Sequence, residues 1–109
     1  MVYTKIKLQK LINKLVKEFK KEVSVDKILL FGSYAAGKPH QWSDLDIAVI
    51  SPDFQGKYKI DRIGKLMDAV YRVPCEIDIE PLGYTSEEYK KASPLTFLGE
   101  IKKTGIRIV

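Results

Sequence analysis

Residues 30–50 read L-F-G-S-Y-A-A-G-K-P-H-Q-W-S-D-L-D-I-A-V-I. We expect an apolar strand to run into Gly32 and Ser33, and a second strand to begin at Asp46 after a turn. Side chains alternate along a strand, so Asp44 and Asp46 should share one face, with Cα atoms about 6.5–7 Å apart. Two carboxylates about 5 Å apart repel by roughly 3 kcal/mol at an effective dielectric near 20. The stretch therefore predicts a hard cation such as Mg²⁺ between them, or a carboxyl group that keeps its proton.

The composition is that of a globular protein with one core. Of the 109 residues, 45% are hydrophobic and 30% are charged, which predicts a single domain over residues 1–109. No apolar run approaches the roughly 20 residues that span a bilayer, and the N-terminus lacks the apolar core of a signal peptide. We therefore expect a cytoplasmic protein that makes no use of a membrane. The lone cysteine, Cys75, excludes an internal disulfide framework.

Positive charge is concentrated at the start of the chain. The net charge is +5, and residues 1–27 contain eight lysines against three acidic residues, a surplus that equals the whole net charge. A solvated helix face is the simpler interpretation, and attraction to a phosphate-bearing ligand or an acidic partner is the alternative. Nucleic-acid binding is the least favoured interpretation, because aromatic residues are not interleaved with these lysines.

The apolar spacing predicts helices alternating with short strands. Helix 4–22 should be capped by Thr4, and the later helices should begin at Ser33, near residue 58, at Ser86 and at Ser93. Strands are predicted at 27–31, 46–50, 75–80 and 106–109, with a turn at 81–83. The predicted apolar face of helix 58–72 consists of Ile60, Ile63, Leu66, Met67, Val70 and Tyr71. This order indicates an α/β (α+β) fold.

The strand predicted at 75–80 can supply a third carboxylate. Asp78 alternates with Ile77 and Ile79, which should face the core, and it shares its face with Glu76 and Glu80. If this strand lies beside that of the acidic pair, Asp78 reaches the same place from about 4.8 Å across the sheet. Three carboxylates can hold two Mg²⁺ ions roughly 3.5–4 Å apart, the arrangement used in phosphoryl-type transfer.

Each candidate residue also has a plain structural explanation. Asp44 could cap a turn, and Asp46 could lie on a solvated sheet face. Ser33 could be a helix cap, although beside Gly32 it is also suited to grip phosphates. Trp42 could stack on a base or anchor its loop to the core. The occurrence of all these residues in one pattern favours a functional site.

The segments G-S-Y-A-A-G and S-D-L-D, followed by a strand with one more aspartate, resemble the nucleotidyltransferase superfamily that includes DNA polymerase β. The resemblance covers nearly the whole chain and is strongest to the small stand-alone members called minimal nucleotidyltransferases, of the MNT type. It implies the nucleotidyltransferase fold, a small mixed sheet flanked by helices. It also implies that Gly32 and Ser33 grip the nucleotide phosphates and that Asp44, Asp46 and Asp78 are the catalytic metal ligands.

The resemblance further implies Mg²⁺-dependent transfer of a nucleoside monophosphate, AMP from ATP, to a hydroxyl group of a partner protein. Such proteins are often antitoxins of a HEPN-domain toxin, which they modify on a tyrosine or bind and block. A non-catalytic module that sequesters the HEPN partner is therefore the alternative. Family members often have arginine at the position of Ala36, so one phosphate contact is missing here.

Overall fold

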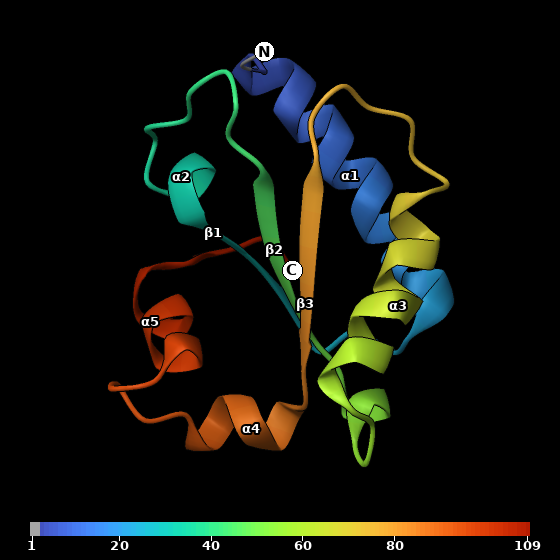
Figure 1. The fold of residues 1–109 in the computed structure, drawn as a ribbon, viewed down its shortest axis with the longest axis vertical. Coiled ribbons are helices and arrows are strands. Elements are labelled where there is room, and N and C mark those ends of the chain that lie inside the picture. The colour runs from blue at the N-terminus through green and yellow to red at the C-terminus, as the bar shows by residue number, and fades with distance from the viewer. Residues whose placement is uncertain (1–2) are drawn as a thin grey trace.

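The computed structural model describes residues 3–109. Its strands are β1 (Lys27–Phe31), β2 (Leu45–Ile50), β3 (Ile79–Tyr84) and β4 (Ile106–Arg107). Its helices are α1 (Lys5–Glu22), α2 (Gly32–Ala35), the 3-10 helix η1 (Pro52–Phe54), α3 (Lys59–Val70), α4 (Ser86–Lys91) and α5 (Phe97–Thr104). The strands form one sheet in the order β3-β2-β1-β4, with helices packed around it (Figure 1). This confirms the predicted α/β fold class. Within the described residues, no helix is both long and apolar enough to cross a bilayer.

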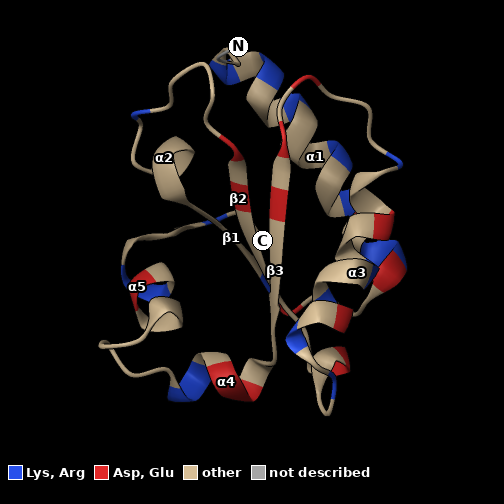
Figure 2. Ribbon diagram, viewed as in Figure 1, with Lys and Arg blue, Asp and Glu red and all other residues tan. Residues whose placement is uncertain are grey.

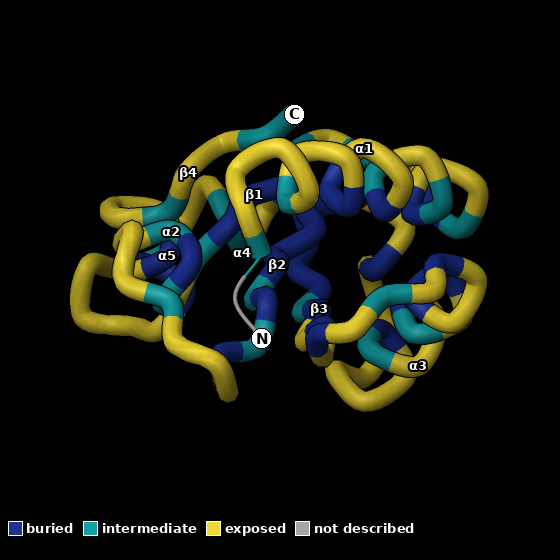
Figure 3. Tube along the Cα trace, turned by 90° about the horizontal axis from the view of Figure 1, so that it is seen from above, coloured by how far each residue is buried: buried dark blue, intermediate teal, exposed yellow. Residues whose placement is uncertain are grey.

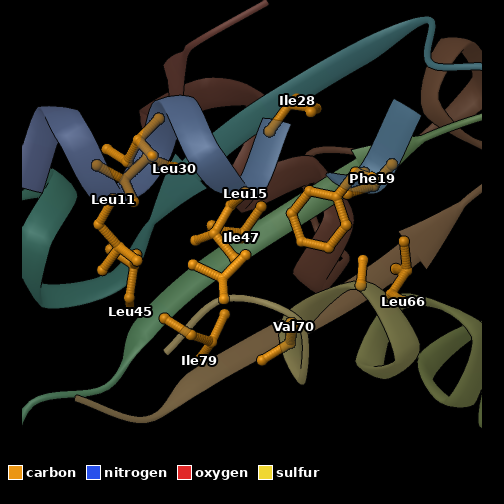
Figure 4. Close-up of a cluster of buried hydrophobic side chains, with 14 of the residues drawn as sticks. Leu11, Leu15, Phe19, Ile28, Leu30, Leu45, Ile47, Leu66, Val70 and Ile79 are labelled. Carbon is orange, nitrogen blue, oxygen red and sulfur yellow. The ribbon is translucent and has the colours of Figure 1, made fainter. Parts of the chain in front are cut away.

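Helix α1 begins where the sequence predicts. The Thr4 hydroxyl caps it by accepting a hydrogen bond from the backbone N–H of Lys7 at 3.3 Å. Its apolar side is buried against the sheet through Leu11, Ile12, Leu15 and Phe19, several of which appear in Figure 4. The lysines of α1 are exposed, so the helix has the predicted amphipathic character.

The sheet buries apolar side chains on both faces. One face packs on α1 and α3 and holds the larger core, which includes Leu15, Phe19, Ile28, Ile47 and Leu66 (Figure 4). The other packs on α5 through Leu29, Ala48, Ile50, Leu98 and Ile101. Figure 3 shows the buried strands at the centre and the exposed outer turns of the helices around them. Each fully buried large apolar side chain contributes roughly 1.5–3 kcal/mol, so these two cores fix which face each strand residue takes.

Strand β3 lies later in the chain than the sequence predicts. The prediction was a strand at 75–80 with a turn at Pro81–Gly83, whereas the observed strand is Ile79–Tyr84 and contains both of these turn-forming residues. The predicted neighbour was right, because β3 pairs with β2, and the pairing is parallel. The wrong boundary matters for the site, because it changes which acidic residue faces β2.

Proline is tolerated in β3 because β3 is an edge strand. The carbonyl groups of Asp78 and Tyr84 accept hydrogen bonds from the N–H groups of Leu45 and Ser51, each at 2.9 Å, on the β2 side. Residues in the alternate phase of the strand, including Pro81, direct their backbone groups away from β2. The missing N–H of proline therefore removes no hydrogen bond from the sheet.

The last two helices begin at threonine rather than at the predicted serine. The Thr85 hydroxyl accepts from the N–H of Glu88, whose carboxylate accepts from the N–H of Thr85, so α4 has a full capping box and Ser86 lies inside the helix. The Thr96 hydroxyl caps α5 by accepting a hydrogen bond from the N–H of Gly99. This cap lies three residues later than the predicted one at Ser93. The predicted end of this helix before residue 105 is confirmed.

The predicted apolar face of α3 is confirmed in part, because Leu66 and Val70 are buried and Ile63 and Met67 are half-buried. Ile60 and Tyr71 were predicted to be buried, but they are 74% and 78% exposed. Arg62 is buried instead, together with Leu66, Ala69 and Val70. The buried side of the helix therefore contains a charged residue that the apolar spacing did not predict.

Arg62 joins three elements. Its guanidinium donates to the carbonyl groups of Lys57 and Gly83 at 3.0 and 3.3 Å, and to the Glu88 carboxylate at 2.7 Å. It also lies 5.9 Å from the centre of the Phe54 ring. These contacts satisfy a buried charge, which explains why the guanidinium outcompetes an apolar side chain at this place.

Candidate active site

Two acidic residues stand opposite each other on adjacent strands. Asp46 of β2 is paired with Glu80 of β3 in the parallel register and with Phe31 of β1 in the antiparallel register. Figure 2 shows acidic segments of β2 and β3 side by side in the half of the sheet nearest α2. Because Asp46 and Glu80 alternate with Ile47 and Ile79 of the larger core, they lie on the opposite face, the one that α5 partly covers.

Gly32, which directly follows β1, forms one border of the site. It is the first residue of α2 and has a φ of 75°, a left-handed conformation that glycine adopts without steric cost. A Cβ atom added to Gly32 would overlap the carboxylate of Asp46. The junction of β1 and α2 can come this close only because residue 32 has no side chain. The Gly-Ser segment and the Asp-x-Asp segment are therefore in direct contact.

Ser33 is the second residue of α2 and does not cap it. The N-cap position is occupied by Phe31, whose side chain makes no capping hydrogen bond. Ser33 is half-buried, and its carbonyl group accepts from the N–H of Lys38 at 3.0 Å. The plain helix-cap interpretation of Ser33 is therefore wrong, and its role in binding phosphate stays a prediction.

Both members of the acidic pair have pKa values raised above their ordinary values. Burial raises the pKa of Asp46, while its hydrogen bond with Glu80 acts in the opposite direction. The pKa of Glu80 is raised first by that hydrogen bond, and further by burial and by the charge of Asp44. Negative charge is thus crowded at this point of the sheet.

Asp44 and Asp78 lie one step further along the two strands. The N–H of Leu45 donates to the carbonyl of Asp78 at 2.9 Å, which places Asp78 next to Asp44 and two residues from Glu80. Asp44 is half-buried and Asp78 is exposed. The place opposite Asp46, which the sequence assigned to Asp78, is taken by Glu80.

The loop before Asp44 is held by a serine. The N–H of His40 donates to the Ser43 hydroxyl at 2.8 Å, and the N–H of Ser43 donates to the carbonyl of His40 at 2.9 Å. Ser43 is buried, so this closed turn positions the following acidic residue. Trp42 is 78% exposed and does not anchor the loop to the core. Its stacking on a base stays a hypothesis.

Two hollows share Glu80 in their lining. The first, of about 470 Å³, lies between the pair and α5 and is lined by Phe31, Gly32, Asp46, Glu80, Leu82, Phe97, Glu100, Ile101 and Thr104. The second, also about 470 Å³, lies at the β3 edge and is lined by Asp44, Met67, Val70, Tyr71, Val73, Pro74, Cys75, Ile77, Asp78, Ile79 and Glu80. Both volumes are in the range that accommodates a small molecule or a side chain of a partner. A donor and an acceptor can therefore approach Glu80 through two different hollows.

Sequence reasoning missed three residues of this site. Glu80 was noted only as sharing the face of Asp78, and its position follows from the edge placement of Pro81, a signal present in the sequence. Phe97 and Glu100, which line the first hollow, were not identified, although the predicted last helix included both of them. No local pattern indicates that they reach the face of the carboxylates.

The donor atoms at this site suit a hard cation. Asp44, Asp46 and Glu80 offer carboxylate oxygens only, the ligands that Mg²⁺ prefers. Within residues 3–109, no three Asp, Glu, His or Cys side chains already form the cluster of a complete metal centre. The raised pKa values of Asp46 and Glu80 reflect crowded negative charge that a divalent cation would relieve, so these residues fit such an ion.

Sequence comparison places these residues in a known family. Residues 12–102 match the family model described as "Nucleotidyltransferase domain". The chain therefore belongs to this family and is a nucleotidyltransferase. It is 31% identical over 106 residues to a protein of Methanocaldococcus jannaschii named "Putative protein adenylyltransferase MJ0141", an alignment that covers 89% of this chain and 98% of the relative.

Two solved structures have the same fold. One, described as "Crystal structure of the toxin-antitoxin with AMP-PNP", has a TM-score of 0.59 and 25% identity, covering 89% of this chain and 71% of that chain. The other is described as "Crystal structure of a putative nucleotidyltransferase from Sulfolobus solfataricus at 1.40 A resolution" and has a TM-score of 0.58 at 16% identity, covering 98% of this chain and 89% of that one. The predicted nucleotidyltransferase fold is thereby confirmed.

Proposed function

We propose that this chain transfers AMP from ATP to a hydroxyl group of a partner protein. The observation that carries the proposal is the contact of Gly32 with Asp46 beside Glu80, which brings the Gly-Ser segment against paired carboxylates. The name of the Methanocaldococcus relative and the AMP-PNP of the toxin-antitoxin structure support a protein acceptor and an adenine nucleotide. The proposal takes residues 1–109 as one nucleotidyltransferase domain that works in the cytoplasm.

The proposed roles follow from position. Gly32 and Ser33 hold the phosphates of ATP, because backbone N–H groups at the start of a helix favour anions. Asp44 and Asp46 hold Mg²⁺, and the third carboxylate comes from β3. Glu80 supports that role through its register with Asp46, while Asp78 remains the sequence-based candidate. Bound Mg²⁺ neutralises charge on the transferring phosphoryl group and its leaving group.

The chain itself positions the acceptor. Its hydroxyl group approaches from the β3 side, where the second hollow borders Glu80 and the exposed Tyr71. The pKa of Glu80 is raised, first by its hydrogen bond with Asp46, so its carboxylate is a stronger base than that of an ordinary glutamate and is suited to accept the proton of the hydroxyl group. We propose a HEPN-domain toxin as the acceptor, as the resemblance to minimal nucleotidyltransferases implies.

The direct test uses label transfer. Purified chain is incubated with α-labelled ATP, Mg²⁺ and the protein encoded by the adjacent reading frame, and label on that protein is measured. We expect labelling by the wild type and a loss of at least about 100-fold with Asp46→Asn, since charge stabilisation in such sites contributes on this scale. If neither the wild type nor Asp46→Asn labels the neighbouring protein, or if both label it equally, catalysis by this site is excluded.

A non-catalytic binding module is the second candidate function. It is favoured by Ala36, which is exposed at the end of α2 where related enzymes often have arginine. Exposed apolar side chains on α3 and before α5, such as Ile60, Tyr71 and Leu95, offer surface for a partner. Tight complex formation that is unaffected by Asp44→Asn and Asp46→Asn, without label transfer, would support this function over catalysis.

A further inference from the structure

We propose that the chain also transfers AMP from ATP to its own Tyr71, which makes this tyrosine a site of self-modification. This inference rests on the proposed function, because it uses the same transfer chemistry, and it goes beyond that function by naming an acceptor inside the chain. Tyr71 directly follows α3 and lines the second hollow together with Asp44, Asp78 and Glu80.

The second hollow reaches both faces of the sheet at its β3 edge. Ile79 packs in the larger core, whereas the side chain of Glu80 points to the opposite face, and both residues line the hollow. In the sheet of the described residues β3 is an edge strand, so the space beside it is open to a side chain from α3. Figure 1 shows the segment after α3 arching over to the start of β3. A side chain at the end of α3 can therefore approach the carboxylates around this edge.

Tyr71 carries the hydroxyl group of this hollow. The other lining side chains are carboxylates, apolar groups and the thiol of Cys75. That thiol is a poor competitor as a nucleophile, because burial raises its pKa and it donates a hydrogen bond to the carbonyl of Ile77 at 3.1 Å. Tyr71 is 78% exposed, so its hydroxyl group can meet a nucleotide without rearrangement of the core.

The backbone on both sides of Tyr71 is held in place. Val70 and Val73 are buried in the larger core. Arg72 donates a hydrogen bond to the carboxylate of Glu18 on α1 at 2.7 Å. Tyr71 is thus an exposed side chain on a fixed turn, which lowers the entropy cost of presenting its hydroxyl group to the site.

The other tyrosines of the chain lack this combination of exposure and position. Tyr58 is 80% exposed, but it precedes α3 at the opposite end of the helix and lines neither of the two hollows. The remaining ones are buried or half-buried and line neither hollow, namely Tyr3, Tyr34, Tyr84 and Tyr89. Tyr58 therefore provides a matched control for Tyr71.

The transfer is a displacement at phosphorus. The Tyr71 oxygen attacks the α-phosphorus of ATP and forms a new O–P bond, while the bond from the α-phosphorus to the oxygen that bridges to the β-phosphate breaks and pyrophosphate leaves. The hydroxyl proton passes to a carboxylate of the hollow, such as Glu80, which later releases it to water. The product is a phosphodiester between tyrosine and adenosine.

The test uses the purified chain alone with Mg²⁺ and either α-labelled or γ-labelled ATP. We expect α-label, but no γ-label, to stay on the denatured chain, and peptide mass spectrometry to place AMP on Tyr71. Tyr71→Phe should reduce the label at least about tenfold, because phenylalanine has no nucleophilic oxygen. Tyr58→Phe should keep the wild-type level of label. Circular dichroism and thermal unfolding check that Tyr71→Phe is folded.

A mixing experiment tests whether the transfer stays within one chain. Asp46→Asn carrying an affinity tag is mixed with untagged wild type, and label is measured on each. We expect label on the wild type and none on the tagged chain, whose Tyr71 is intact but whose own acidic pair is not. Label on the tagged chain would show transfer between copies and would overturn transfer within one chain.

The outcomes separate this inference from the proposed function. Label on the protein encoded by the adjacent reading frame, without label on Tyr71, overturns self-modification and leaves the proposed transfer to a partner standing. Label on the chain that persists in Tyr71→Phe overturns the assignment to Tyr71. Label on Tyr71 but not on the neighbouring protein supports self-modification and overturns that protein as the acceptor. Absence of label from both proteins overturns both proposals.

Discussion

Gly32 lies so close to the carboxylate of Asp46 that a single added carbon atom on Gly32 would overlap it. The two residues come from segments that are separated by a loop, yet β1 and β2 pair so that residue 31 faces residue 46. The absence of a side chain at residue 32 is therefore a requirement of the acidic site as well as of the backbone turn.

Gly32→Ala should abolish label transfer, with a loss of about 100-fold or more, because the added methyl group displaces the Asp46 carboxylate. The same change also strains a backbone with a φ of 75° and should cost roughly 1–2 kcal/mol of stability. Gly37→Ala is the matched control: its φ is 71°, but nothing lies within 4 Å of the added Cβ. It should cost similar stability and keep transfer activity. Equal activity of the two variants would contradict the packing argument.

The two candidates for the third carboxylate can be separated by mutation. Because Glu80 faces Asp46 across the ladder, Glu80→Gln should reduce label transfer at least about 100-fold. Asp78→Asn should reduce it less than about tenfold, since Asp78 lies beside Asp44 and not opposite Asp46. Initial rates at saturating Mg²⁺ and ATP give the comparison. The reverse order of effects would return the third place to Asp78.

The acidic pair predicts a stability that falls as pH rises in the absence of divalent cations. Asp46 and Glu80 have pKa values raised above 3.8 and 4.5, so between these ordinary values and the raised ones the folded chain holds protons that the unfolded chain has lost. The free energy of unfolding therefore decreases as the pH rises through this window, and it stays lower at pH values above the window. Urea denaturation in EDTA across this window measures the effect.

Two comparisons check that interpretation. Glu80→Gln cannot ionise, so its stability should decline less over the same window. Saturating Mg²⁺ should stabilise the wild type above the window and have little effect below it, where the carboxyl groups are protonated. A pH dependence that is identical in wild type and Glu80→Gln would show that other groups cause it.

Arg62 should be important for stability although it is remote from the acidic pair. Its side chain is 7% exposed and pairs with Glu88 at 2.7 Å, so Arg62→Met should cost about 2–3 kcal/mol. This value is below that for a fully buried pair, because 40% of the Glu88 side chain is exposed. Lys91→Ala removes the exposed ion pair with Glu87 and should cost less than about 0.5 kcal/mol. Chemical denaturation of both variants provides the measurement, and equal losses would contradict the role assigned to Arg62.

The sequence predicted helices and strands correctly where the local residue pattern agrees with the burial of the side chains. The alternation around Asp46 and the apolar run before Gly32 predict two strands whose ends meet, and the structure has both. The first helix was also predictable, because its cap and its apolar spacing both indicate the same start at Thr4.

The errors arose where tertiary context outweighs local preference. Pro81 and Gly83 are turn residues by propensity, but at the edge of a sheet they belong to a strand. Ile60 was expected in the core, but a buried ion pair with Glu88 draws Arg62 there instead. The contribution of Phe97 depends on how α5 packs on the sheet, which no short sequence pattern determines.

The edge formed by β3 has a consequence for how this protein meets other chains. Pro81 presents no N–H to the outside, and the carbonyl of Gly83 already accepts a hydrogen bond from Arg62. An incoming strand would thus find few backbone groups to pair with, which protects this border from intermolecular sheet extension and aggregation. Recognition at this border must instead rely on the shape and chemistry of side chains, and these can change during evolution without disturbing the sheet.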